Sequence, residues 1–202
     1  RDTIEVWSGY TISGLLQYKD TMAVSTPLGN VNIYLLNENN VVIDSATTDA
    51  TGYYEFKGLF TGDYSFDVLI NKPWYGGNTL DALKVVFHFI GTNTLSGLNL
   101  IAADVNANGT VNTADALNIQ MRFVGMMSSF PAGDWVYEKD TIVVGGNSHC
   151  NYNFHALCVG DVDGSYIPAS KGSQSNYIKY DSMKWEDIKI KGIPFGKSSN
   201  IK

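Results

Sequence analysis

A twelve-residue stretch, 104–115, places oxygen-bearing side chains at positions 1, 3, 5, 9 and 12 and a glycine at position 6. These side chains belong to Asp104, Asn106, Asn108, Asn112 and Asp115. Position 7, Thr110, offers its carbonyl oxygen. A hard cation such as Ca²⁺ takes about six to eight oxygen ligands, and the glycine allows the sharp turn that gathers them. The stretch therefore predicts a calcium loop that leads directly into a helix, with no helix entering it.

Two other interpretations of this loop stay open. Turns rich in Asn and Asp also occur without a metal. In addition, Asn108-Gly109-Thr110 matches a glycosylation sequon. A glycan on Asn108 would displace one of the calcium ligands, so we favour the metal loop.

A repeat with a spacing of 34 residues relates this loop to an earlier segment: Gly77–Leu83 matches Val111–Leu117. Each copy continues into an apolar helix that we expect to end before a glycine, as a helix C-cap does. The first copy offers Asn78 and Asp81 at positions 9 and 12. The residues at its positions 1, 3 and 5 would be Ile70, Lys72 and Trp74, which cannot bind calcium.

A complementary half-loop lies downstream, where Asp161, Asp163 and Ser165 match positions 1, 3 and 5. Nothing after them supplies positions 9 and 12. We therefore hypothesise a second, split calcium site that combines this half with Asn78 and Asp81. The alternatives are an ordinary Asp-Gly turn without metal, and a missing half supplied by a neighbouring molecule.

The segment 10–70 is dominated by apolar and polar residues in alternation, as in Val31–Leu36 and Tyr64–Leu69. The short strands that this period predicts are separated by polar or glycine turns, which is typical of an antiparallel β-sandwich. The fold class we expect is mainly β with a small α part. It comprises the sandwich, two loop-helix units over 71–130, and further β segments over 131–170.

Several motifs of the first segment resemble those of carboxypeptidase-regulatory-like and CnaB-type β-sandwiches of bacterial surface proteins. They include Pro27–Val31, Thr48–Phe56 and Leu59–Tyr64. The resemblance implies a spacer or stalk without chemistry of its own.

Residues 76–125 resemble a dockerin, a pair of calcium loop-helix units. That resemblance implies calcium-dependent folding and docking onto a cohesin. It also implies recognition residues beside the last ligand of each loop and along the helices. In this sequence these positions are Thr79, Leu80, Thr113, Ala114, His88 and Arg122.

Two cysteines, Cys150 and Cys158, lie close together in the sequence. A small disulfide-closed loop is the outcome we favour. Two free thiols remain possible, and so does a metal site that includes His149 and His155.

Both chain ends contain alternating segments, 3–7 and 187–191, which we expect to form short strands that pair with an exposed sheet edge. We treat 1–9 as the N-terminal strand and 171–202 as a basic tail. The tail holds seven lysines against three acidic residues, whereas the whole chain carries a net charge of −6. The chain starts with Arg1, from which we expect a processed or excised segment. An acidic body with a basic tail could attract further copies of itself head to tail.

The acidic balance argues against a nucleic-acid partner, and no apolar run is long enough for a membrane helix. We find no nucleophile elbow, phosphate loop or zinc-hydrolase motif, so we do not expect an enzyme. We expect a secreted, extracellular or cell-surface calcium protein that mediates protein–protein assembly, as a subunit of a surface filament or fibre. The alternatives are a dockerin that binds a cohesin and a carbohydrate-binding module. The latter would use aromatic side chains that we expect to be exposed, namely Trp74, Tyr75, Trp135 and Trp185.

Overall fold

The structure is a computed structural model that describes residues 9–19, 26–146 and 149–168. The chain divides into two compact units, 1–170 and 171–202, and every described residue belongs to the first. The strands expected at the chain ends, the basic tail and Trp185 lie outside the described residues.

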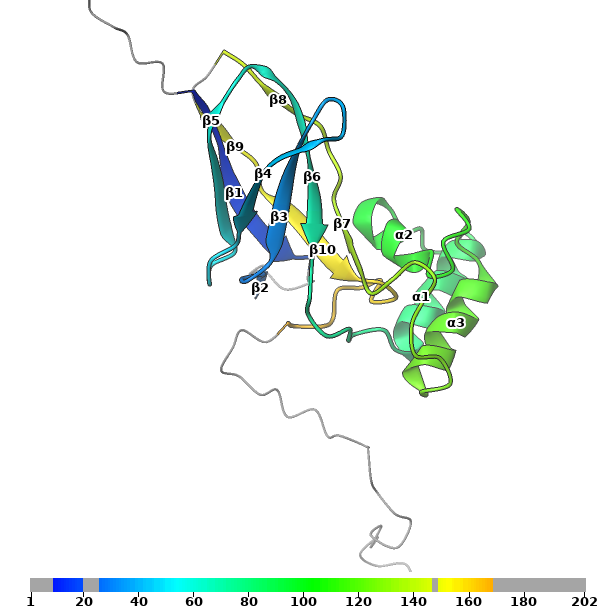
Figure 1. Cartoon of the computed structure of the whole chain (residues 1–202). Helices are drawn as coiled ribbons and strands as arrows, with labels where there is room; N and C mark the ends of the chain where they lie inside the picture. Colours follow the sequence, from blue (N-terminus) through cyan, green and yellow to red (C-terminus); the bar gives the residue numbers. More distant parts are fainter. Residues whose placement is uncertain (1–8, 20–25, 147–148, 169–202) are drawn as a thin grey trace, which may run out of the picture. The chain divides into compact units, whose positions relative to one another are not determined.

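The first sheet is built around β1 (Tyr10–Tyr18), which is shown in blue in Figure 1. Its other members are β2 (Thr26–Pro27), β5 (Tyr53–Leu59), β7 (Trp135–Tyr137), β9 (His149–Asn151) and β10 (Phe154–Cys158). Strands β5 and β2 pair with β1 in antiparallel orientation. Strands β9 and β10 pair in succession with β1 in parallel orientation, and β7 pairs with β10.

The second sheet is antiparallel, with the strand order β4-β3-β6-β8. Its strands are β3 (Asn32–Asn37), β4 (Val42–Thr47), β6 (Gly62–Leu69) and β8 (Ile142–Val144). Alternate residues of the central strands, such as Ile33, Leu35 and Phe66, are buried, and they share one core with Ile12 and Phe56 of the first sheet. The mainly β fold that the alternation predicts is thus present as two sheets around a common core (Figure 1).

The strands after residue 130 are distributed between the two sheets. Strands β7 and β10 complete the first sheet, and β8 forms an edge of the second by pairing with β6. Because β10 lies directly beside β1, residues from the two ends of the described chain are neighbours in one sheet. The segment 131–170, expected as an extension, therefore contributes to the sandwich itself.

Three helices follow β6: α1 (Thr79–Phe89), α2 (Gly97–Ala103) and α3 (Thr113–Phe123). Helices α1 and α3 pack against each other, while α2 packs against β7 and β10. The expectation that no helix precedes the 104–115 loop is wrong, because α2 ends directly before Asp104. Helix α2 was missed because it is only seven residues long and begins at a glycine with φ of 54°, which gives little periodic signal.

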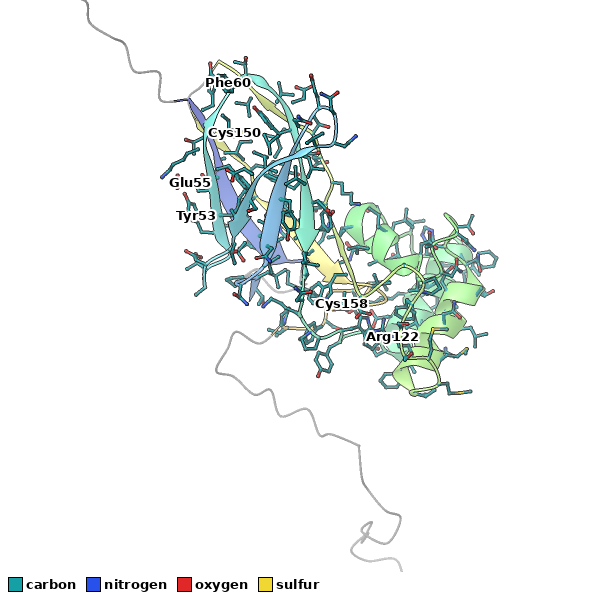
Figure 2. The ribbon with its side chains drawn as sticks, viewed as in Figure 1. Tyr53, Glu55, Phe60, Arg122, Cys150 and Cys158 are labelled. Atoms are coloured by element: carbon teal, nitrogen blue, oxygen red, sulfur yellow. The ribbon has the colours of Figure 1, made fainter. Side chains whose placement is uncertain are left out.

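The predicted disulfide is absent, since Cys150 and Cys158 are both free. Their positions along β1 explain why. Cys150 pairs with Ile12 near the beginning of β1, and Cys158 lies beyond the pairing of Ala156 with Tyr18 at its end. Figure 2 shows the two cysteines at opposite ends of the sheet. Because β9 and β10 run in one direction along β1, the two thiols can neither bond nor share a metal.

Candidate calcium centres

The 104–115 loop closes on itself through its own side chains. Asp104 ends α2 and accepts hydrogen bonds from the N–H groups of Asn108 at 3.1 Å and Gly109 at 2.8 Å. At the other end, Asn112 caps α3, and Asp115 bonds back to the N–H of Asn112 at 3.0 Å. The side chain of Asp115 also accepts a bond from the N–H of Asn106, which lies on the far side of the loop. We call this the contiguous loop.

The residues of the hypothesised split site lie together. Asp81, Asp161 and Asp163 are buried, and each offers a carboxylate oxygen within 4.8 Å of the others. Asp81 comes from the first turn of α1, and the other two follow β10. The N–H of Asp163 donates to Asp81 at 3.2 Å, which joins the two half-loops directly. We call this assembly the split loop.

The split loop repeats the hydrogen bonds of the contiguous loop in its front half. The N–H of Ser165 donates to Asp161 at 3.1 Å and to Asp163 at 2.9 Å, as that of Asn108 does to Asp104 and Asn106. The N–H of Tyr166 donates to the second oxygen of Asp161, as the N–H of Gly109 does to that of Asp104. The front half of the split loop thus shares these backbone hydrogen bonds with the contiguous loop, and Gly164 and Ala107 both have positive φ at position 4.

The back half corresponds equally closely. Asn78 and Asp81 form a reciprocal capping box at α1, as Asn112 and Asp115 do at α3. The bond from the N–H of Asp163 to Asp81, which joins the two separate segments, corresponds to the bond from the N–H of Asn106 to Asp115. Two segments some 80 residues apart in sequence therefore meet as one loop. The two half-loops are thus arranged as the split-site hypothesis requires. Occupation of either loop by calcium stays a prediction.

Position 7 of the split loop was not predicted from the sequence. The side-chain amide of Asn78 donates to the carbonyl of Gly76 at 2.9 Å, as that of Asn112 does to the carbonyl of Thr110. Gly76 therefore takes position 7 of the split loop. Its identity follows from its spacing, since it precedes Asn78 by two residues, as Thr110 precedes Asn112. A Cβ at Gly76 would lie 2.6 Å from a carboxylate oxygen of Asp161, and φ is 99°, so a glycine is needed here.

The acidic groups of the split loop are electrostatically unequal. Burial, with Asp163 and Asp161 nearby, raises the pKa of Asp81 to about 8. Burial also raises the pKa of Asp161, although the Tyr18 hydroxyl opposes this shift. Burial disfavours the charge on Asp163 too, but hydrogen bonds from Lys84 and Ser165 outweigh it and the pKa of Asp163 is lowered. Ionisation is thus disfavoured at Asp81 and Asp161, and a divalent cation bound between them would favour their charged forms.

We expect the calcium-free protein to lose stability as the pH rises from about 4 to about 8. An unfolded Asp has a pKa of about 3.9, so Asp81, at about 8 when folded, holds a proton that the unfolded chain releases between these values. The contribution of this proton to folding stability is fully present at a pH below the unfolded pKa. It is lost as the pH rises through the folded pKa. Melting temperatures measured in chelator across this range test the slope. Asp81→Asn, which cannot ionise, should flatten it, and an equal slope in both proteins would contradict the assignment.

The split loop is fastened to the sandwich core. The hydroxyl of Tyr18, a fully buried residue at the end of β1, donates to Asp161 at 2.5 Å. The indole N–H of Trp74 donates to the carbonyl of Val159 at 2.6 Å, and the side-chain amide of Asn99 in α2 donates to that of Val162 at 2.8 Å. The segment between β10 and Ser165 is therefore held by the sandwich, by α2 and by the chain that leads into α1.

The positions expected to contact a partner fall into two groups. Thr79, Leu80, Thr113 and Ala114 are exposed at the beginnings of α1 and α3. His88 is half-buried, and its Nδ1 accepts a hydrogen bond from the N–H of Leu95 at 2.9 Å.

Arg122 is not available to a partner, which corrects that expectation. Its side chain is only 6% exposed, and the guanidinium lies 3.8 Å from the centre of a Trp74 ring and bonds to Asp134 at 2.6 Å. Figure 2 places Arg122 in the helical region. Arg122 lies on the face of α3 that packs inward, because cation–π contacts with Trp74 and Phe130 accommodate its charge there.

Two of the aromatics considered for carbohydrate binding are engaged inside the molecule. Trp74 packs edge-on against Phe130, and Trp135 packs edge-on against Tyr18 while its N–H donates to the carbonyl of Lys72 at 3.0 Å. Both indoles are half-buried, and the expectation that they are exposed is wrong. Tyr75 is exposed. A flat binding platform of tryptophans is therefore not formed by the described residues.

No helix among the described residues is long and apolar enough to cross a membrane.

Among known proteins, the chain is similar to serine-aspartate repeat-containing proteins of staphylococci. It is 25% identical over 163 residues to protein I of Staphylococcus saprophyticus, a match that covers 77% of this chain and 8% of the relative. It is 26% identical over 161 residues to protein F of Staphylococcus epidermidis, which covers 77% of this chain and 9% of the relative. The chain thus spans less than a tenth of the length of these relatives.

Among solved structures, the minor pilin GBS52 of Streptococcus agalactiae has a TM-score of 0.38 and 11% sequence identity over 76% of this chain and 46% of that one. No protein-family model matches the sequence. The dockerin resemblance of the loop-helix units therefore stays a prediction.

Proposed function

We propose that this chain is a non-catalytic structural module of an extracellular or cell-surface protein, in which two calcium ions fix a helical pair to a β-sandwich and thereby enable protein–protein assembly. The observation that carries the proposal is the correspondence between the two loops. Two distant half-loops, joined by the bond from Asp163 to Asp81, reproduce the hydrogen bonds of a contiguous twelve-residue loop. Neither half could hold a divalent ion alone.

The donors in both loops suit calcium. The contiguous loop offers Asp104, Asn106, Asn108, the carbonyl of Thr110 and Asp115, with Asn112 reaching the ion through water. The split loop offers Asp161, Asp163, Ser165, the carbonyl of Gly76 and Asp81, with Asn78 in the place of Asn112. All are oxygen ligands, which favours a hard cation over zinc or copper. Modules that bind calcium at extracellular concentrations use such loops.

A structural role is supported by what the acidic side chains do. Asp104, Asp115 and Asp161 each accept backbone N–H groups that shape their loops, so they hold the chain in place. The CnaB-type motifs of the sandwich resemble those of bacterial surface proteins, and the similarity to staphylococcal repeat-containing proteins is consistent with such a location.

The assembly part of the proposal is tested by size-exclusion chromatography with light scattering on the intact chain, in calcium and in chelator. Self-assembly predicts a mass above that of the 22.1 kDa monomer that grows with protein concentration in calcium and falls in chelator. A monomer in both conditions would exclude self-assembly and leave a different protein as the partner.

A second candidate, docking onto a cohesin, is favoured by a paired apolar surface on the helices. Leu83 and Leu117, which correspond in the 34-residue repeat, are 43% and 56% exposed. Phe89 with Phe123 and Ile90 with Val124 form further exposed pairs at the same spacing. Such large apolar side chains commonly mark a protein interface.

Calcium-dependent binding to a panel of purified cohesin modules tests the docking function. The double substitution Leu83→Ser with Leu117→Ser should abolish binding and leave calcium stoichiometry unchanged, because both residues are exposed. Binding that survives the double substitution would place the interface elsewhere.

A further inference from the structure

A lysine distinguishes the split loop from the contiguous loop. Lys84 lies one turn after Asp81 on α1, and its Nζ is 2.7 Å from Oδ2 of Asp163. The side chain of Asp163 is 8% exposed and that of Lys84 is 31% exposed, so this ion pair is shielded from water on the Asp163 side. At the corresponding place in the repeat, three residues after Asp115, α3 carries the neutral Asn118.

The lysine accompanies a second difference in charge. Position 3 is Asp163 in the split loop and Asn106 in the contiguous loop. The split loop therefore holds three carboxylates, and the contiguous loop holds two. With the ammonium of Lys84 included, the formal charge of both loops is −2. The additional acid and the additional base thus occur together, and the structure joins them in one ion pair.

The two oxygens of Asp163 have different partners. Oδ1 accepts the N–H of Ser165, as Oδ1 of Asn106 accepts that of Asn108, so Oδ1 of Asp163 corresponds to the ligand oxygen expected at position 3. Oδ2 is bonded to Lys84. The lysine can therefore remain in place when Oδ1 binds a cation, and it then acts on that cation through its charge.

We infer that Lys84 is a built-in counter-ion of the split loop, which keeps the loop assembled without calcium and lowers its affinity when calcium binds. The inference rests on the calcium-binding function proposed above and adds a difference between its two sites. Without calcium, Lys84 neutralises the carboxylate of Asp163, which lies beside the buried carboxyl groups of Asp81 and Asp161 and would otherwise repel their charged forms. With calcium, a positive charge one carboxylate away from a divalent ion weakens its binding by about tenfold at the dielectric constant of bulk water, and by more in a less polar environment.

The consequence is a difference between the two loops at low calcium. The split loop, which joins β10 to α1, contains the ammonium group of Lys84, whereas the contiguous loop has no cation in the corresponding position. The connection between sandwich and helices is then expected to persist when calcium falls, at the expense of binding strength at that site.

The test is a calcium titration of the full chain by calorimetry, together with its melting temperature in chelator. Asp104→Ala silences the contiguous loop, so that the split loop is measured alone. In this background Lys84→Gln should bind calcium about tenfold more tightly, and it should melt at a lower temperature in chelator. Lys84→Arg, which keeps the charge, should retain both parental values.

A matched variant reverses the experiment without removing any interaction. Asn118→Lys, in an Asp161→Ala background that leaves only the contiguous loop, should weaken calcium binding there about tenfold and should not lower the melting temperature in chelator. This variant keeps the inference testable if Lys84→Gln proves too unstable without calcium.

The opposite signs of the two effects separate a counter-ion from an ordinary packing residue. If Lys84→Gln left both quantities unchanged, or lowered stability and affinity together, the inference would be overturned while the calcium function stood. If the unmodified chain bound no calcium, the proposed function would fail instead.

Discussion

Replacing Asp161 by alanine is expected to reduce the number of bound calcium ions from two to one and to lower the melting temperature in calcium by about 5–10 °C. A site held at about one hundred times its dissociation constant contributes about 2.7 kcal/mol of folding free energy. Each kcal/mol corresponds to about 2–4 °C for a domain of this size. Asp161 occupies position 1 of the split loop, where its two oxygens accept N–H groups from Ser165 and Tyr166. Calorimetric titration and differential scanning calorimetry measure the two effects.

Tyr18→Phe is the control for this substitution, because Asp161 also accepts the buried hydroxyl of Tyr18. The control removes that hydrogen bond, together with the one that the hydroxyl accepts from the N–H of Cys158 at 3.2 Å, and keeps the carboxylate. It should cost about 1–3 kcal/mol, since the hydrogen bond involves a charged group, and it should leave two calcium ions bound. A stoichiometry of two in Asp161→Ala would show that the split loop does not bind calcium. A loss of one ion in both variants would assign the effect to the sandwich core.

Removing calcium from the unmodified chain should have the largest effect on stability, roughly 5 kcal/mol or about 10–20 °C in melting temperature, because both sites are emptied. Emptying the split loop also removes a link between α1 and the chain after β10, although the bond from Lys84 to Asp163 remains. We therefore expect proteolysis in chelator to cut first around the helices, while the sandwich is cut later. Scanning calorimetry and timed digestion with mass spectrometry follow the two effects.

Magnesium provides the control for calcium removal. It demands near-octahedral geometry and gives up water reluctantly, so it should restore little of the lost stability at the same concentration. Full restoration by magnesium would mean that general screening of the acidic side chains, rather than a loop of defined shape, accounts for the stabilisation. An unchanged melting temperature in chelator would contradict the calcium function as a whole.

The sequence allowed the fold class and the local shape of both loops to be predicted, because those features are encoded by neighbouring residues. Alternation of apolar side chains predicted β structure over 10–70, and the spacing of Asp and Asn predicted the loop conformation. The split loop was accessible because its halves were each recognisably incomplete. The structure shows them joined by the bond from Asp163 to Asp81.

The features that sequence reasoning missed depend on contacts between distant segments. The parallel pairing of β1 with β9 and β10 leaves no local trace, and it alone separates Cys150 from Cys158. Arg122 was expected to contact a partner because the dockerin resemblance implied a recognition residue at this position, but Trp74 and Phe130 receive its guanidinium in the interior. Lys84 gave no signal by itself, since only the fold brings it to Asp163.

The place of β1 in the first sheet governs when the molecule can fold. During synthesis this strand emerges before two of its partners, β9 and β10, which follow some 130 residues later in the chain. Contacts so distant in sequence are slow to form, and until they form the apolar face of the strand stays uncovered. A chain that is exported across a membrane in the unfolded state would therefore close its sandwich only on the extracellular side, where calcium is plentiful.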